Sequence, residues 1–428
     1  MADGAVSALE AARAEAYSTP LDQIDVSLQS RFVTNTIWPF FERLRKEDPV
    51  HYGVSPEFGP FWSITKFEDI IAIETNHQVF SSEKSISIGD NDGQDPNDAS
   101  FELPMFIAMD PPKHDEQRKT IAPIVSSENL RNMEPLIRER AGKILDELPI
   151  GEPFDWVQRV SVELTTQMLA TLFDFPFEER GKLTYWSDLT TNPFTPSKIN
   201  PGEVMEFEEV KAELLSCAAY FKGLWDLRVT EPPKADLISM LAHGEATKDM
   251  PLFEFLGNIL LLIVGGNDTT RNTISGGLLA LNDNPDQYDK LRANPALIET
   301  MVPEMIRYQS SVAHMRRTAK EDFEFQGKSI KKGDKVVMWY VSGNRDETAI
   351  PNADAFIIDR ERPRHHAAFG FGIHRCVGMR LAEMQLRVVW EEVMKRYPRI
   401  DVIGEPVRLE TCFLRAIRSL QVQIPARA

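Results

Sequence analysis

The stretch that decides the fold is Phe369-Gly370-Phe371-Gly372-Ile373-His374-Arg375-Cys376-Val377-Gly378. It places one cysteine among glycines, directly before a segment whose apolar residues recur with helical spacing. Glycines let the backbone turn tightly and approach a flat ligand, while a helix start and Arg375 favour an anionic sulfur. The loop therefore suits a thiolate that binds a metal. A buried structural cysteine in a glycine-rich turn is the alternative, and it is the commoner one for an isolated cysteine.

The composition is that of a folded, acidic protein. The 428 residues include 48 Lys and Arg against 65 Asp and Glu, a net charge of −17. This balance excludes a general binder of nucleic acid or of anionic membranes. With 24 Phe, 7 Trp and 8 Tyr the chain can bury a large core. Cys217, Cys376 and Cys412 cannot form an even disulfide framework, so we expect a reducing compartment.

Nothing in the sequence predicts export or insertion into a membrane. The first residues carry Asp3, Glu10 and Glu15, where a signal peptide needs a basic end and an apolar run. The longest strongly apolar stretch, Leu256 to Val264, falls far short of the roughly 20 residues of a spanning helix. We therefore expect a cytoplasmic protein.

Helical periodicity covers most of the chain, and strand-like alternation is confined to short pieces. The predicted helices are 130–148, 160–173, 205–227, 252–281, 296–308 and 379–397, and the predicted strands lie within 51–64, 335–340 and 419–424. Polar, irregular stretches lie at 89–100, 191–202 and 343–364. The predicted fold class is mainly α with a small β region, in a single domain over residues 1–428 with a loosely ordered N-terminal arm over residues 1–30.

The ten residues around Cys376 resemble FGxGxHxCxG, the haem-binding loop of the cytochrome P450 family. The resemblance implies that haem b is the cofactor and that Cys376 is the axial thiolate on its iron, a ligand that favours O–O cleavage. It also places Phe369 against the sulfur and His374 near a haem propionate, with Gly370 and Gly378 in the same haem-binding loop. The implied fold holds the haem between a long distal helix and the cysteine loop.

A second block, Gly265-Gly266-Asn267-Asp268-Thr269-Thr270, interrupts the longest helical stretch. Interior glycines cost a helix about 1 kcal/mol each, so a distorted helix and two helices joined by a turn are equally compatible with the composition. The block resembles the family's (A/G)Gx(D/E)T(T/S). That resemblance implies room for dioxygen beside Gly265, with Thr269 hydrogen-bonded to the oxygen and Asp268 helping to deliver protons, as the two catalytic residues. Cleaving O–O to water needs two protons in a pocket that is otherwise kept dry.

Glu304-Met305-Ile306-Arg307 forms a third block. An ordinary, solvated helix pair is the usual interpretation of such spacing. The resemblance instead implies the family's buried ExxR network, completed by Arg360, with a role in folding and haem retention. Pro303 predicts a helix start or a kink directly before Glu304.

Further residues resemble the family's partners for the haem propionates. Asp110-Pro111-Pro112-Lys113-His114 with Arg118 resembles DPPxH…R, and Arg317-Thr318-Ala319 resembles RxA. Arginine suits carboxylates because its planar fork donates two parallel hydrogen bonds, although each arginine alone is compatible with an ordinary surface position. The resemblance implies a clamp formed by His114, Arg118, Arg317 and His374.

The sequence carries no dinucleotide fingerprint and no second cysteine cluster, so we expect electrons from NAD(P)H through a ferredoxin reductase and a [2Fe–2S] ferredoxin. Residues 360–380 hold five arginines against the single Glu361, a local balance of +4. Charge complementarity speeds the encounter with an acidic partner. The predicted docking residues are Arg362, Arg364, Arg375, Arg380, Lys113 and Lys119, the alternative being that some of these arginines are buried against the propionates and the ExxR network.

The resemblance also predicts which residues line the substrate pocket. The candidates are Ile86, Ile88, Leu103, Phe106, Val264, Gly265, Val312, Met315, Phe413 and Leu414. They favour an apolar guest, although ordinary core packing is the alternative for each of them.

The strings GGNDTTRN at 265–272 and HMRRTA at 314–319 resemble the bacterial branch of soluble alkane and fatty-acid terminal hydroxylases. That branch inserts one atom of O2 into the end carbon of a medium-length chain, which requires a narrow channel that aims the methyl group. One alternative is a terpenoid, steroid or aromatic guest hydroxylated at a non-terminal carbon. Another is a non-catalytic haem protein that binds or senses a ligand, although such a protein has no need of Asp268 and Thr269.

Overall fold

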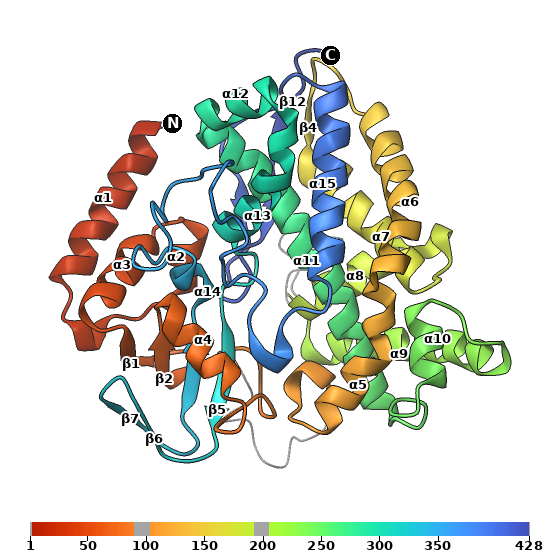
Figure 1. Ribbon diagram of the computed structural model, residues 1–428, viewed down its shortest axis with the longest axis horizontal. Helices are drawn as coiled ribbons and strands as arrows, with labels where there is room; N and C mark the ends of the chain where they lie inside the picture. The colour runs from red at the N-terminus through yellow and green to blue at the C-terminus, as the bar shows by residue number, and fades with distance from the viewer. Residues whose placement is uncertain (1, 90–102, 192–204, 428) are drawn as a thin grey trace.

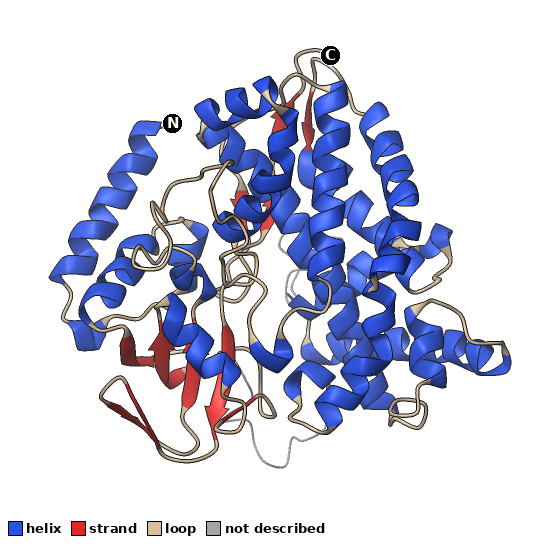
Figure 2. Ribbon diagram, in the orientation of Figure 1, coloured by secondary structure: helices blue, strands red, loops and turns tan. Residues whose placement is uncertain are grey.

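The computed structural model describes residues 2–89, 103–191 and 205–427 (Figure 1). Helices make up most of the molecule, and the larger sheet lies at one corner of it (Figure 2). The predicted fold class, mainly α with a small β region, is confirmed. Parts of the predicted irregular stretches 89–100 and 191–202 lie outside the described residues.

Helix α11 (Leu252–Asp283) is the centre of the packing. It contacts α7 (Glu163–Leu172), α8 (Gly181–Thr191), α9 (Phe207–Thr230), α13 (Ile298–Gln309) and α15 (Met379–Arg396). A helix that is apolar on all sides belongs in a core. By length and composition α11 could also cross a membrane, but just over half of its most apolar window is already buried against its neighbours.

The other helices surround this core, with α15 packed along α6 (Ser127–Asp146). They are α1 (Ala2–Ser18), α2 (Gln29–Val33), α3 (Trp38–Glu47), α4 (Phe67–Thr75), α5 (Lys113–Ile121), α10 (Leu237–His243), α12 (Pro285–Ala293) and α14 (Tyr340–Gly343). Each helix expected from periodicity is present, with ends that move by a few residues. The predicted helix 160–173 begins with π-helical geometry over Val157–Val162 before α7 continues it.

The main sheet has five strands in the order β1-β2-β8-β5-β3. Only the β2–β8 pair is parallel, with Trp62 opposite Val336. The strands are β1 (Val50–Ser55), β2 (Gly59–Ile64), β3 (Phe80–Ser81), β5 (Met315–Ala319) and β8 (Lys335–Met338). Smaller sheets contain β4 (Pro153–Asp155), β6 (Phe323–Phe325), β7 (Lys328–Ile330), β9 (Asp401–Val402), β10 (Val407–Arg408), β11 (Ile417–Ser419) and β12 (Gln421–Gln423).

Strand β5 is absent from the sequence prediction. Its residues, Met-Arg-Arg-Thr-Ala, show none of the apolar alternation that marks a half-buried strand. The reason is that Arg316 and Arg317 are both buried, so the side chains on its two faces are hidden from solvent.

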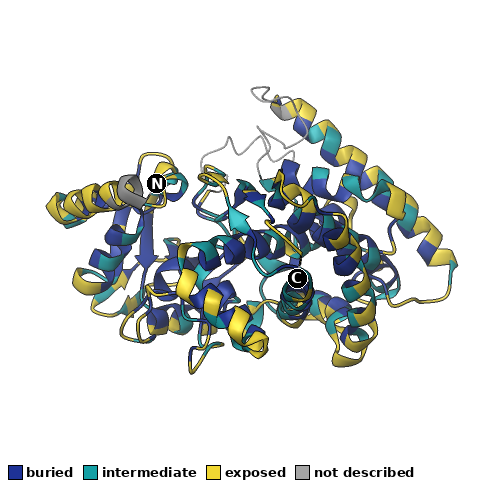
Figure 3. Ribbon diagram, turned by 90° about the horizontal axis from the view of Figure 1, so that it is seen from above, coloured by how far each residue is buried: buried dark blue, intermediate teal, exposed yellow. Residues whose placement is uncertain are grey.

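The prediction of a loosely ordered arm at the N-terminus is wrong for the described residues. Helix α1 packs on α3, with Ala16 fully buried and its carbonyl accepting a hydrogen bond from Arg43. Its outer face is exposed (Figure 3). Ion pairs join Arg13 to Glu42 at 2.7 Å and Arg31 to Glu15 at 2.8 Å. Small alanines allow the close approach that these contacts need.

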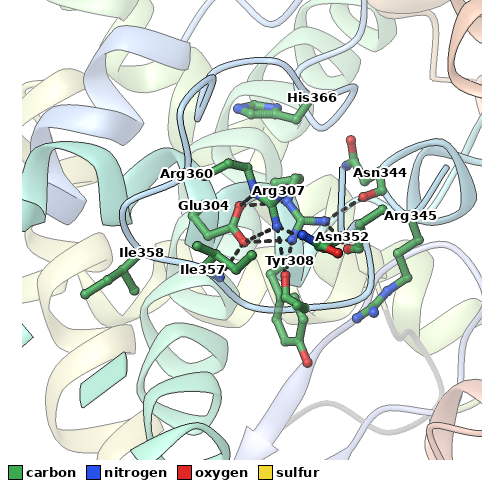
Figure 4. A network of polar contacts seen from close by, with 12 residues as sticks. Glu304, Arg307, Tyr308, Asn344, Arg345, Asn352, Ile357, Ile358, Arg360 and His366 are labelled. Carbon is green, nitrogen blue, oxygen red and sulfur yellow. Dashed lines mark hydrogen bonds and ion pairs between the residues drawn. The ribbon is translucent and has the colours of Figure 1, made fainter. Parts of the chain in front are cut away.

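Glu304, Arg307 and Arg360 meet in a buried network (Figure 4). The Glu304 carboxylate accepts two hydrogen bonds of 2.7 Å from Arg307, and two more, of 2.9 and 3.1 Å, from Arg360. Arg307 also donates to the carbonyls of Asn344 and Ala353 at 2.6 and 2.7 Å. The network therefore fastens the long, mostly irregular stretch that leads to the cysteine loop.

Pro303 lies within α13, which begins at Ile298, so of the two predicted alternatives the helix start is wrong and a kink remains a prediction. The first turn of the helix is already formed before the proline is reached.

Replacing Arg307 by leucine should destabilise the protein strongly, because it leaves a buried carboxylate and several carbonyls without a donor. Losing one partner of a buried pair costs about 3–5 kcal/mol. Urea unfolding monitored by circular dichroism measures this loss. Lys143→Ala, at an exposed ion pair on α6, is the control and should leave the midpoint unchanged. Equal midpoints for the two variants would contradict the structural role.

Candidate active site

The cysteine loop turns sharply before α15, and its glycines are needed for that turn. Gly370 and Gly372 have φ angles of +63° and +64°, in the left-handed region. A Cβ atom added at Gly372 would lie 2.5 Å from the carbonyl oxygen of Glu74. The Cys376 N–H donates to the Phe369 carbonyl at 2.8 Å, which closes the loop. The backbone therefore presents the thiol in one fixed orientation.

The electrostatic surroundings of Cys376 work in opposite directions. Burial raises the pKa of the Cys376 thiol, whereas the N–H groups of Gly378 and Met379 and the guanidinium groups of Arg118 and Arg375 lower it. Cys376 is nevertheless exposed, so it faces an opening inside the protein. These donors favour a thiolate as soon as a cation binds the sulfur.

Helix α11 passes unbroken through the block at 265–270, which decides between the two interpretations left open by its composition. Gly265 is exposed, and a Cβ atom added there would meet nothing within 4 Å. The Thr269 hydroxyl donates to the Gly265 carbonyl at 2.9 Å. Open space therefore lies beside this turn of the helix.

Asp268 is buried beside an ion pair that the sequence analysis did not identify. Arg271 lies 2.6 Å from the Asp268 carboxylate and donates to Asp188, on α8, at 2.8 Å. Burial raises the pKa of Asp268 to about 6, although Arg271 opposes the shift. Asp268 can therefore exchange a proton near neutral pH.

A cavity of about 60 Å³ adjoins this ion pair, lined by Thr184, Asp188, Thr191 and Arg271 among others. Apolar side chains, such as Val157, Val162 and Ile417, line much of the rest of it, and a few water molecules fit a space of that size beside the polar residues. Protons thus have a polar surface on which to approach Asp268.

The four residues of the expected clamp lie close together. The two histidine rings are in contact, and the two arginines donate hydrogen bonds to backbone carbonyls. The rings of His114 and His374 lie 4.1 Å apart. Arg118 donates to the Arg375 carbonyl, and Arg317 donates to the Arg316 carbonyl at 2.8 Å.

His114 and His374 each keep one ring nitrogen that is buried without a hydrogen-bond partner, Nε2 of His114 and Nδ1 of His374. Burial lowers the pKa of both rings, to about 2 for His374. An adjacent carboxylate would reverse this shift, because a negative charge favours the protonated ring.

Glu74, on α4, is a site residue that sequence reasoning missed. It is buried, and it accepts a hydrogen bond from the Phe371 N–H at 2.6 Å and another from the Tyr340 hydroxyl. Arg317 lies 3.4 Å from it. Burial raises the pKa of the Glu74 carboxyl, and Arg317, Tyr340 and Phe371 oppose the shift. No motif marks this glutamate, since its partners lie hundreds of positions away.

The ten candidate pocket residues fall into two groups. Ile88, Phe106 and Leu414 are only 1 to 4% exposed, which agrees with the alternative of ordinary core packing. Gly265 is exposed, and the partly exposed members are Ile86, Leu103, Val264, Val312, Met315 and Phe413. The side chains left to face a ligand are all apolar.

Comparisons with known proteins agree with this geometry. The model of the family described as "Cytochrome P450" matches residues 207–402. Linalool 8-monooxygenase from Pseudomonas putida is 36% identical over 89% of this chain and 94% of its own length. The chain belongs to the cytochrome P450 family. The structure of cytochrome P450-153 from Novosphingobium aromaticivorans is 42% identical over 93% of this chain and 98% of that one, with a TM-score of 0.85. The structure of CYP153D17 from Sphingomonas sp. PAMC 26605 is 46% identical over 94% of this chain and 98% of that one, with a TM-score of 0.86.

Cytochromes P450 bind haem through an axial cysteine thiolate, and the residues of this chain fit that group. Cys376 faces an opening, and the position of Gly265 leaves space that any larger side chain would fill. The unpartnered nitrogens of His114 and His374, beside Arg118 and Arg317, suit two carboxylates. Haem, when bound, supplies the centre at which dioxygen is activated and one oxygen atom is inserted into a C–H bond.

Replacing Glu74 by alanine should loosen this cytochrome P450's hold on haem, because the cysteine loop loses the acceptor for the Phe371 N–H. We expect a larger share of ferrous–CO absorbance at 420 nm than at 450 nm, and faster haem transfer to apomyoglobin. The control is Glu68→Ala, an exposed glutamate on the same helix, which should match the wild type. Identical haem transfer from Glu74→Ala and Glu68→Ala would contradict this role.

Proposed function

We propose that this monooxygenase hydroxylates the terminal carbon of medium-length linear alkanes or fatty acids. The observation that carries the proposal is that the expected pocket residues that remain partly exposed, among them Val264, Val312, Met315 and Phe413, are all apolar. A guest whose reacting end is a plain methyl group suits such a lining. Similarity to the cytochrome P450-153 structures, and to the methyl-branched lipid omega-hydroxylase of Mycobacterium tuberculosis at 31% identity, supports it.

Terminal attack is a positioning task. A primary C–H bond is stronger than the neighbouring secondary one, so the enzyme must hold the methyl group closer to the reactive centre than the next carbon. Apolar side chains on facing walls provide that alignment without polar contacts. A terpenoid guest is the second candidate, because the relative with 36% identity is a linalool 8-monooxygenase.

The proposed proton path begins at Asp188 and Arg271 and ends at Asp268 and Thr269. Arg271 is paired with Asp268, and Arg271 and Asp188 both line the small cavity. Thr269 is partly exposed at the open turn of α11, where its hydroxyl can exchange the Gly265 carbonyl for a ligand oxygen. These two residues give the site the protons that O–O cleavage consumes.

The proposal includes a soluble, cytoplasmic [2Fe–2S] ferredoxin that receives electrons from NAD(P)H through its reductase. Arg362, Arg364, Arg375 and Arg380 are exposed around the cysteine loop, although Arg364 is paired with Glu383 at 3.1 Å. Among the other predicted docking residues, Lys119 is exposed, whereas Lys113 is paired with Glu254 at 2.8 Å. Arg360 is buried in the network with Glu304, as the alternative interpretation anticipated for some of the arginines. An acidic partner suits the remaining exposed basic residues.

Asp268→Asn should lower product formation by about 10²-fold, because the site loses its proton donor. The wild-type share of NADH electrons that ends in product should fall as the pH rises from about 6 to about 8, since Asp268 titrates near pH 6. The Asp268→Asn variant should lose this pH dependence. Thr269→Ala should consume NADH with little product.

Steady-state NADH consumption and product yield, measured across this pH range, test the assignment. Asp283→Asn, at the exposed end of the same helix, is the matched control and should keep the wild-type profile. An unchanged pH profile in Asp268→Asn would show that another group delivers the proton.

A spin-state titration of the purified ferric protein tests the substrate class. The panel contains linear alkanes, fatty acids and alkyl esters of graded length, set against terpenes, steroids and small aromatics. We expect a low-to-high-spin shift that is largest at one linear chain length, followed by the terminal alcohol as the main product. A shift with cyclic or branched guests only would refute terminal hydroxylation of linear chains.

A further inference from the structure

Three separate segments that carry expected pocket residues lie side by side. The strand-like residues 311–316 run between residues 86–88 on one side and 412–415 on the other. The Arg316 N–H donates to the Ile86 carbonyl at 2.8 Å. On the opposite side, the Ala313 N–H donates to the Phe413 carbonyl at 2.8 Å, and Val312 pairs with Leu414. Ile86, Val312 and Phe413, which are partly exposed, come one from each segment.

The side chain of His314 crosses all three segments. Its Nδ1 lies 3.0 Å from the Cys412 carbonyl, which can only accept, so Nδ1 carries the proton. Its Nε2 is then a bare acceptor, and the Ile88 N–H donates to it at 3.0 Å. The two partners thus fix one neutral tautomer. Complete burial agrees with this state, since it lowers the pKa of His314 to about 4.

Aromatic packing holds the His314 ring in place. Trp339 lies 4.7 Å from it and Phe413 lies 5.4 Å from it, measured between ring centroids. Trp339 is itself buried, with its indole N–H donating to Ser63 at 3.1 Å. The ring therefore has little freedom to tilt, and its two hydrogen bonds keep a constant length and direction.

We propose that His314 is a specificity-determining brace, which holds the segment of Ile86 and Ile88 at a fixed distance from the Phe413 tip and so sets the width of the substrate channel. This inference rests on the proposed function, because a linear chain needs a narrow channel. His314 acts by positioning the walls. It is fully buried behind them and stands in neither the thiolate loop nor the distal helix.

The physical basis is that, among the described residues, His314 is the side chain that hydrogen-bonds to both flanking segments, although Gln309 and Arg415 also fasten the 412–415 segment to the end of α13. Main-chain bonds to residues 311–316 hold each flanking segment on one side only, whereas His314 binds both. Removing its hydrogen bonds leaves the Ile88 N–H and the Cys412 carbonyl buried without partners. A buried polar group without a partner moves toward water, and the channel widens as it does so.

His314→Phe removes both hydrogen bonds and keeps a flat ring against Trp339. We expect the ratio of terminal to in-chain alcohol to fall several-fold at equal haem content, with a several-fold higher Kd in the spin-state titration. His314→Gln can present its amide oxygen to the Ile88 N–H, and we expect it to recover part of the wild-type ratio. His243→Phe is the matched control, because both ring nitrogens of that histidine also lie close to backbone carbonyls, at 2.9 and 3.2 Å, but on α10. It should leave the products unchanged.

Hydrogen exchange gives a readout that is independent of turnover. In a peptide covering residues 82–89, the Ile88 amide should be protected in the wild type, exchange faster in His314→Phe, and regain protection in His314→Gln. Wild-type exchange and wild-type regiochemistry in haem-loaded His314→Phe would overturn the brace.

If His314→Phe does not load haem, the comparison of His314→Gln with His314→Asn decides, because Asn can reach only the Cys412 carbonyl. If the Ile88 amide is protected in His314→Gln but not in His314→Asn, the brace is supported. If the amide exchanges at the same rate in both variants, the brace is overturned. A wild type that never produces a terminal alcohol refutes the proposed function alone, because the exchange experiment still judges the brace.

Discussion

The structure depends on presenting one cysteine sulfur, in one orientation, from a loop that has little regular structure of its own. The stretch from Asn344 to Gly378 contains only a single turn of 3₁₀ helix. Two buried carboxylates hold it at different points along its length. Glu304 fastens its beginning through Arg307 and Arg360, and Glu74 accepts the Phe371 N–H near its end. The rigidity that a metal ligand requires therefore comes from buried carboxylates on other elements of the fold, which hydrogen-bond to this stretch.

These charges are costly to bury, and the protein compensates by giving each one several partners. Glu304 accepts from two guanidinium groups, and Glu74 accepts from a backbone N–H and a tyrosine hydroxyl. A buried pair contributes little net stability, but breaking one is expensive, so such networks favour one arrangement over all others. In this cytochrome P450 that preference holds the stretch that carries Cys376 in one position relative to α4 and α13.

The Asp268 carboxylate, on the central helix α11, differs from these two, because it has fewer partners. Asp268 is buried with one cationic neighbour, Arg271, and that neighbour is shared with Asp188. The incomplete compensation leaves the pKa of Asp268 near 6, where the residue can take up and release protons. A buried carboxylate whose charge is balanced by two guanidinium groups, like Glu304, holds the fold in one arrangement. A buried carboxylate that shares one guanidinium group, like Asp268, has a raised pKa and can transfer protons.

The sequence by itself determined the family, the central helix and the residues expected at the haem, because those residues lie in short motifs around Cys376, Asp268 and Glu304. Only the tertiary structure decided which distant groups support them. Glu74 and Phe371 are 297 positions apart, and His314 and Ile88 are 226 apart. The local sequence pattern also fails to predict β5. Its arginines are buried in the structure, but in the sequence they look like exposed, polar residues. Periodicity and propensity act over a few residues, whereas these polar side chains are placed by partners that folding alone brings together.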